Sequence, residues 1–207
     1  MTRKVAVVLA LLVSPCMAFS NMHPYGGVQV GQERGGATLY DETGVRSHYS
    51  HDGMEGGAFI GVGTELIPHI WTALEINGDF SSARTATQGI TTNSGSATAK
   101  LRTRYSYGIS FVPGIRIARV MLYGRAGALQ SRFELKQIPQ PDGSSSPVAQ
   151  PIAAGAVYGG GLQFNVTGGW SVRGEYDRVI YRHFPAFNNR VSVIDHQYTL
   201  GVLFEMC

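Results

Sequence analysis

One short segment of the 207-residue chain contains the residue types used in nucleophilic catalysis. Residues 47–52 read SHYSHD, and a serine beside a histidine and a carboxylate is the set that activates a hydroxyl nucleophile. His48 and His51 could also bind a metal ion, although the sequence places no third ligand beside them. We expect this segment to be a polar, exposed loop, with the catalytic and metal-binding interpretations as alternatives. His183 and His196 stand alone, so we predict no catalytic residue, metal site or cofactor.

The elements that must position these side chains are predicted by a period-2 alternation of apolar and polar residues. The alternation is clearest in residues 100–111, KLRTRYSYGISF. Lys100, Arg102 and Arg104 fall on one face of this strand. The other face carries Leu101, Thr103, Tyr105, Tyr107, Ile109 and Phe111. In water such a strand would bury its apolar face in a sandwich, whereas in a bilayer it would turn that face to lipid and its cations to a polar lumen.

Seven further segments repeat this pattern, some of them less cleanly. They are residues 25–32, 54–66, 70–80, 120–134, 154–166, 170–180 and 194–204. Short joins lie at 67–69, 113–119 and 167–169, and long polar joins lie at 33–53, 81–99, 135–153 and 181–193. Short turns at one end and long loops at the other are the plan of an outer-membrane barrel. The predicted fold is therefore all-β, an eight-stranded antiparallel up-and-down transmembrane β-barrel.

Composition excludes two other classes of protein. Hydrophobic residues make up 43% and aromatic residues 10% of the chain, which is too apolar for a disordered chain. The mean hydropathy of −0.02 leaves no room for several apolar helices of about 20 residues each. Glycine accounts for 27 residues, and in a narrow barrel we expect glycines to make room for large inward-pointing neighbours.

The first residues, MTRKVAVVLALLVSPCMAFS, have the features of a secretory signal peptide. Arg3 and Lys4 precede an apolar run, and small residues follow it. We therefore divide the chain into a signal peptide, residues 1–20, and one barrel domain, residues 21–207. The 17 lysines and arginines less the two of the leader leave 15 basic against 14 acidic residues, a balance that does not favour nucleic acid as a partner.

The chain resembles the small outer-membrane β-barrels of Gram-negative bacteria, the OmpA-transmembrane-domain and opacity-porin-like group. The resemblance rests on the leader and on PYGGVQVGQ, VMLYGRAGAL, WSVRGEYDRV and YTLGVLFEM. It implies a location in the outer membrane, in contact with membrane lipid and lipopolysaccharide. It also implies that the barrel assembly machinery recognises the last strand. The matching residues there are Leu200, Gly201, Val202 and Phe204, and Met206 holds the place of the usual terminal phenylalanine.

Charged residues of both signs fall on the predicted inward faces of the strands. They are Glu75, Asp79, Lys100, Arg102, Arg104, Arg125, Arg173, Glu175 and Asp177. An eight-stranded barrel has room inside only for side chains, and unpaired buried charges are costly, so we favour a lumen filled by ion pairs. A channel whose basic residues favour anions is the alternative.

Aromatic residues gather near the ends of the predicted strands, where outer-membrane barrels carry interface girdles. The predicted girdle residues are Tyr25, Trp71, Phe80, Trp170, Tyr176, Tyr198 and Phe204. The join at 181–193 combines aromatic residues with arginine, which are residue types enriched in binding hot spots. Phe184, Phe187 and Arg190 are therefore candidates to contact a host or cell-surface ligand, and a loop packed on its own aromatics is the alternative.

Three functions follow from this interpretation. The first is a surface protein with a structural role in the envelope, or a role as an adhesin or antigen through its extracellular loops. The second is a narrow channel for small solutes. The third is an enzyme that modifies lipid A. Lipid-deacylating barrels keep a His-x-Ser-Asn type of motif late in the chain and on a strand, whereas residues 47–52 lie early and in a predicted loop, so we expect no enzyme.

Overall fold

The computed structural model describes residues 22–40, 46–83, 90–92, 95–138, 148–149, 152–182, 184–186 and 189–206. Eight long strands occupy most of this part of the chain: β1 His23–Tyr40, β2 Arg46–Ile67, β3 Ile70–Ser81, β5 Gly95–Ile117, β6 Val120–Ile138, β8 Ile152–Thr167, β9 Trp170–Tyr181 and β11 Asn189–Glu205. Three short strands accompany them: β4 Ile90–Thr92, β7 Val148–Ala149 and β10 Phe184–Ala186. Each predicted strand forms, and the predicted leader, residues 1–20, lies outside the described residues.

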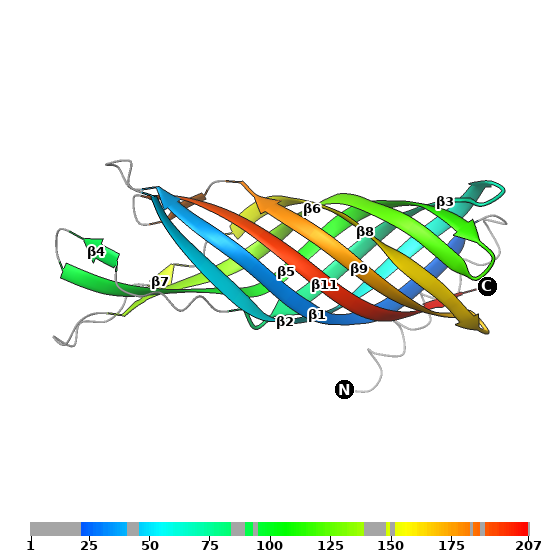
Figure 1. Ribbon diagram of the computed structural model, residues 1–207, viewed down its shortest axis with the longest axis horizontal. Coiled ribbons are helices and arrows are strands. Elements are labelled where there is room, and N and C mark those ends of the chain that lie inside the picture. The colour runs from blue at the N-terminus through cyan, green and yellow to red at the C-terminus, as the bar shows by residue number, and fades with distance from the viewer. Residues whose placement is uncertain are drawn as a thin grey trace, which may run out of the picture.

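The eight long strands close into a barrel in which neighbours run antiparallel (Figure 1). Their order around the barrel is β1-β2-β3-β5-β6-β8-β9-β11, and β11 returns to β1 with Val202 opposite Val28. Just after β11, the Met206 N–H donates to the Pro24 carbonyl at 2.8 Å. This architecture confirms the predicted eight-stranded antiparallel barrel. Among the described residues, no helix has the length and apolar character that a membrane-spanning helix needs.

Three two-residue turns join strands at the end of the barrel where β1 begins and β11 ends (Figure 1). These turns are Pro68-His69, Ala118-Arg119 and Gly168-Gly169. The last turn needs positive φ at both positions, 58° and 83°, which glycine adopts without a steric penalty from Cβ. The join predicted at 113–119 is shorter than expected, because β5 continues to Ile117.

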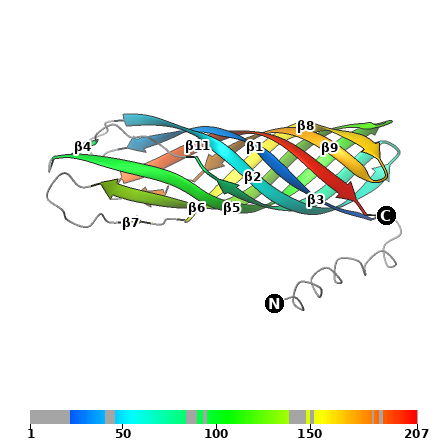
Figure 2. The ribbon, with the colours of Figure 1, turned by 90° about the horizontal axis from the view of Figure 1, so that it is seen from below.

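At the opposite end, β1, β2, β5 and β6 run past their predicted limits (Figure 2). β1 and β2 stay paired as far as Tyr40 and Arg46, so most of the loop predicted at 33–53 is instead a β-hairpin arm. β5 and β6 stay paired to Thr98 and Ile138. In the plan of outer-membrane barrels, this end is extracellular and the short turns are periplasmic.

Successive side chains alternate between the two surfaces of the barrel wall. In β9, burial alternates from exposed Trp170 to buried Tyr181. Large apolar side chains are exposed on the outer surface, among them Val28, Leu74, Ile109, Leu122 and Leu200. Their position forms the outward apolar band that a barrel presents to lipid, with the polar residues of the same strands turned inward.

A β-bulge in β5 reverses this alternation at one point. The register against β6 shifts between Thr103 and Tyr105, so the side chains before the shift change surface. Thr103, which we expected to face lipid, is buried, and Arg104, which we expected to face the lumen, is exposed. The bulge corrects both assignments.

Five of the seven predicted girdle residues point outward, as a place in an interface girdle requires. Phe80, Trp170, Tyr176, Tyr198 and Phe204 are exposed. Ring centroids lie 5.1 Å apart in the pair Trp170–Phe204 and 5.1 Å apart in the pair Tyr176–Tyr198.

Tyr25 and Trp71 correct the prediction of the girdle, because both are buried inside the barrel. Strand alternation decides this, since neighbouring positions such as Val28 and Leu74 take the outward face. These two rings therefore belong to the lumen and not to the membrane interface.

Candidate functional site

Two arginines in the lumen hold three carboxylates. Arg125 of β6 places Nη1 2.5 Å from Glu175 Oε1 and 3.1 Å from Asp177 Oδ2. Arg173 of β9 donates two hydrogen bonds to Glu75 of β3, Nη1 to Oε2 at 2.8 Å and Nη2 to Oε1 at 3.1 Å. Arg125 Nη2 also lies 3.5 Å from Glu75 Oε1, which joins the two groups. All five side chains are buried, and we call them the central charge network.

Hydroxyl groups surround this network and bond to its charged atoms. Tyr123 donates to Glu175 Oε2 at 2.8 Å, and Tyr25 donates to Glu75 Oε2 at 3.2 Å. Arg125 Nε donates to Ser110 Oγ at 3.1 Å. Buried ion pairs are stable only when further hydrogen bonds offset the loss of solvation, and these tyrosines supply such bonds.

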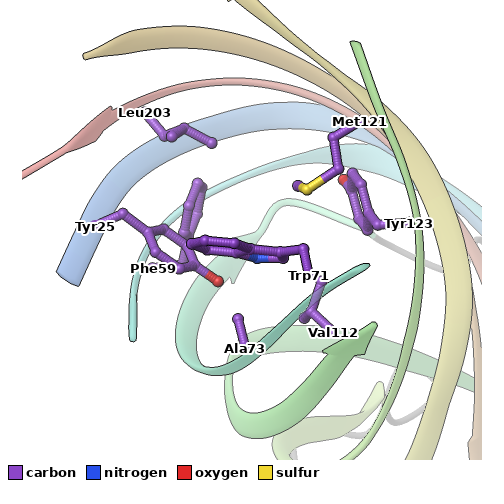
Figure 3. Close-up of a cluster of buried hydrophobic side chains, with 8 residues drawn as sticks. All are labelled: Tyr25, Phe59, Trp71, Ala73, Val112, Met121, Tyr123 and Leu203. Atoms are coloured by element: carbon purple, nitrogen blue, oxygen red, sulfur yellow. The ribbon is translucent and has the colours of Figure 1, made fainter. Parts of the chain in front are cut away.

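A cluster of apolar side chains lies on the periplasmic side of the network. It consists of Tyr25, Phe59, Trp71, Ala73, Val112, Met121, Tyr123 and Leu203. Figure 3 shows these side chains pointing into the barrel from opposite walls, with the Trp71 ring between those of Phe59 and Tyr123. The Arg173 guanidinium lies 3.7 Å from the centroid of the Phe59 ring, so the charge network rests directly on this cluster. The cavity left here is about 10 Å³, about the space of one water molecule.

Glycines on the inner wall make this packing possible, as the sequence predicted. A Cβ on Gly63 would overlap the Trp71 ring, and a Cβ on Gly61 would overlap Tyr25. Glycines on one strand thus lie beside the large aromatic rings of the neighbouring strands, and these rings fill the barrel.

Asp79 also faces the lumen but makes different contacts from those of the central charge network. Its carboxylate accepts hydrogen bonds from Gln29 Nε2 at 2.8 Å and from Asn77 Nδ2 at 2.7 Å. The described ion pairs join it to no arginine. Its position is the predicted one, while its partners are amides.

Of the three cations predicted from residues 100–104, the structure describes the side chain of Arg104 alone, and this side chain does not join the central charge network. Arg104 is exposed and pairs with Glu134, Nε to Oε2 at 3.0 Å. Lys100 and Arg102 lie in β5, opposite Lys136 and Glu134 of β6, and their side chains lie outside the described residues. The alternation of apolar and polar residues in the sequence could not reveal the bulge at Arg104, and so it placed this side chain on the wrong face.

The predicted assembly residues lie in and just after the strand that closes the barrel. Leu200, Val202 and Phe204 are exposed on the outer face. Gly201 turns inward beside Gln29, and Met206 follows β11 directly.

Two of the candidate contact residues, Phe184 and Arg190, lie in strands at the extracellular end. Phe184 belongs to β10, which pairs with β11, and Arg190 lies opposite Pro185 in this pairing. Phe187 lies outside the described residues.

His51 is not in an exposed loop, which corrects the prediction for residues 47–52. Only 5% of its surface is exposed, and it lies in β2 with Nε2 3.0 Å from Asp195 Oδ1 and 3.7 Å from Glu33 Oε1. Sequence reasoning placed Glu33 and His51 in a loop and so missed this cluster. A continued alternation through Gln29, Gly31 and Glu33 was the signal that β1 extends further.

Comparisons with known proteins agree with the fold. A family model described as "Outer membrane protein beta-barrel domain" matches residues 6–205. The outer membrane protease OmpT from Escherichia coli is 8% identical, with a TM-score of 0.55, and the match covers 89% of this chain and 97% of OmpT. No curated protein sequence matches this chain.

Two further solved structures also align with the chain. Ail, the attachment invasion locus protein of Yersinia pestis, is 17% identical over 88% of this chain and 99% of Ail, with a TM-score of 0.46. Neisserial surface protein A is 18% identical over 86% of this chain and 97% of its own, with a TM-score of 0.43. The family model covers nearly the whole chain, and its description as a β-barrel domain agrees with the closed barrel found here. The chain therefore belongs to the outer membrane protein β-barrel domain family, whose place is the Gram-negative outer membrane.

Proposed function

We propose that this protein is a non-enzymatic surface protein whose barrel is closed to solutes and whose extracellular hairpins carry a structural or adhesive role. The observation that carries the proposal is the filled lumen. The central charge network lies on the apolar cluster, and the space remaining there is about 10 Å³. Eight-stranded barrels are just wide enough for side chains to fill them.

Conductance tests the closed barrel against the alternative of a narrow channel. The full chain, reconstituted in planar lipid bilayers, is expected to show no single-channel steps. Steady conductance with a preference for anions would overturn the proposal and favour the channel. The same sample is also run on a gel with and without heating, because heat-modifiable mobility shows that the barrel is folded. This control ensures that an absence of conductance is not caused by unfolded protein.

The hairpin arms are the part of the molecule available to external partners. β1–β2 remains paired to Tyr40 and Arg46, and β5–β6 remains paired to Thr98 and Ile138. Residues 139–147, which follow β6 in the sequence and precede β7, read PQPDGSSSP and are mostly polar. We propose that these arms contact host or cell-surface ligands, together with the segment around Phe184 and Arg190.

Three strains test this role. One makes the full chain, one makes no protein, and one makes a variant in which a short Gly-Ser link replaces residues 139–147. An adhesive protein loses binding to host-cell monolayers when the segment is replaced, while the barrel still assembles. A structural protein keeps the envelope resistant to detergent with either form of the segment. Equal adhesion and equal detergent resistance in all three strains would contradict both roles.

The remaining parts of the proposal concern export and the membrane. Residues 1–20 direct export, the assembly machinery recognises the last strand, and the outward apolar band contacts lipid and lipopolysaccharide. No reaction is part of the proposal. Lipid A mass spectra from cells with and without the protein are expected to be identical, and a modified lipid A that depends on the protein would contradict this.

A further inference from the structure

We propose that Glu33, His51 and Asp195 form a binding site for a divalent transition-metal cation of the zinc class. The three residues come from β1, β2 and β11, which are neighbours in the barrel. One ligand atom from each residue lies within 4.8 Å of the others. His51 Nε2 lies 3.0 Å from Asp195 Oδ1 and 3.7 Å from Glu33 Oε1.

Strand register brings the three side chains together. Gly35 of β1 lies opposite His51 on one side and opposite Asp195 on the other. A Cβ on Gly35 would overlap both the Asp195 carboxylate and the His51 ring, so glycine is what lets these side chains meet. Glu33 precedes Gly35 by two residues and therefore points from the same face of β1.

The polar atoms of these three side chains are buried and, among the described residues, several of them have no hydrogen-bond partner outside the cluster. Glu33, His51 and Asp195 are 1%, 5% and 0% exposed. In the described part of the chain, His51 Nδ1 and Asp195 Oδ2 have no hydrogen bond, and His51 Nε2, Asp195 Oδ1 and Glu33 Oε1 have none beyond their contacts with one another. More than nine in ten buried polar groups are normally bonded, so a cluster of this kind points to a ligand that binds all three residues.

The local charge also favours a cation. Glu55 and Asp79 face the same lumen, and the described ion pairs join Glu33 and Asp195 to His51 and not to arginine. His51 carries at most one positive charge, whereas its two partners Glu33 and Asp195 are both carboxylic acids. Since buried unpaired charge is costly, a bound divalent ion would stabilise the site.

The donor set selects the class of metal. An imidazole and two carboxylates are ligands of zinc, at about 2.0–2.2 Å. Donor atoms 3.0 and 3.7 Å apart suit an ion held between them at such lengths. Calcium prefers six to eight oxygen ligands, and the imidazole disfavours it. Ser81 Oγ donates to Glu33 Oε2 at 2.5 Å, which orients that carboxylate from behind.

Zinc and cobalt titrations test the site in the full chain, folded in detergent micelles, without a histidine tag and after treatment with chelator. We expect a single Zn²⁺ ion per chain to remain after dialysis, and Co²⁺ to give visible absorption bands of nitrogen–oxygen coordination. His51→Gln and Asp195→Asn are each expected to weaken Zn²⁺ binding by at least about tenfold. His196→Gln is the matched control, because this histidine is on the outer face against Tyr176 and its loss leaves affinity unchanged.

Heat-modifiable gel mobility shows which variants fold, and Glu33→Gln is a third, conservative variant in case one of the others does not. Folded wild-type protein that retains no metal overturns the proposal, and the cluster is then a metal-free ion triad. Equal affinity in the His51→Gln and His196→Gln proteins overturns it as well, because the bound ion would then lie elsewhere.

Discussion

Arg173 and Glu75 stand on opposite walls of the barrel and meet in its lumen, joined by hydrogen bonds of 2.8 and 3.1 Å. Around the closed ring, three strands separate β9 from β3 in either direction. The pair therefore ties together walls that share no backbone hydrogen bond. It is the contact of the central charge network that depends most directly on barrel closure.

Replacing Arg173 with methionine is expected to lower the free energy of unfolding by about 3–5 kcal/mol, because Glu75 is left buried without its bidentate partner. Urea unfolding in lipid vesicles measures this change. The double variant Arg173→Met, Glu75→Gln should recover part of the loss. The Glu75→Gln substitution is also measured in the wild-type background. If it lowers the free energy of unfolding equally in the wild-type protein and in the Arg173→Met protein, the two residues are not coupled.

Arg104 and Arg125 should contribute differently to the free energy of unfolding, although the sequence pattern predicts that both face the lumen. Arg104 is exposed at the bulge, so Arg104→Ala is expected to cost less than about 1 kcal/mol in unfolding free energy. Arg125 is buried among three carboxylates, so Arg125→Ala should cost about 3–5 kcal/mol. Urea unfolding of both variants decides this, and similar losses would place Arg104 inside the lumen.

Inward and outward glycines form a second matched pair. A methyl group on Gly63 overlaps the Trp71 ring, so Gly63→Ala is expected to destabilise the barrel by about 1–3 kcal/mol. Gly78 has nothing within 4 Å of its added Cβ, and Gly78→Ala should change stability by no more than about 0.5 kcal/mol. Tryptophan fluorescence during unfolding reports both values. A neutral Gly63→Ala would mean that the Trp71 ring has room to move.

Gly35 tests the geometry of the proposed metal site without removing a ligand. A Cβ there overlaps Asp195 and His51, so Gly35→Ala should weaken Zn²⁺ binding while the three ligands stay in the chain. Gly56→Ala is the control, because its nearest neighbour, the Gln29 carbonyl oxygen, would lie 3.7 Å from the new Cβ. Calorimetric titration of both proteins measures the difference. Equal Zn²⁺ affinities of the two variants would show that the geometry of the site does not depend on Gly35.

The last strand offers a prediction about assembly. Phe204 is exposed beside Trp170, and Phe204→Ala should lower the fraction of protein that reaches the heat-modifiable, folded form in cells. Met206→Phe, which restores a terminal aromatic residue, should raise that fraction. Wild-type behaviour in both variants would mean that this ending does not guide assembly.

The sequence by itself determined the β-barrel. Alternation in residues 170–180 and 194–204 predicts which side chains face lipid, because successive side chains of a strand always take opposite faces. Gly168-Gly169 predicts a tight turn because of its backbone freedom. The balance of an apolar outer face and a polar inner face also explains the mean hydropathy near zero. Each of these signals is local, so it can be read from neighbouring residues.

Only the tertiary structure decided which inward residues meet. One extra residue at Arg104 inverts a face, and the alternation before and after the bulge gives no warning of it. Glu33, His51 and Asp195 come together because closure sets β11 beside β1 and the register places Gly35 between two ligands. Arg173 reaches Glu75 for the same reason: contacts across a lumen depend on how the strands are staggered around the whole barrel, which is a long-range property of the closed sheet.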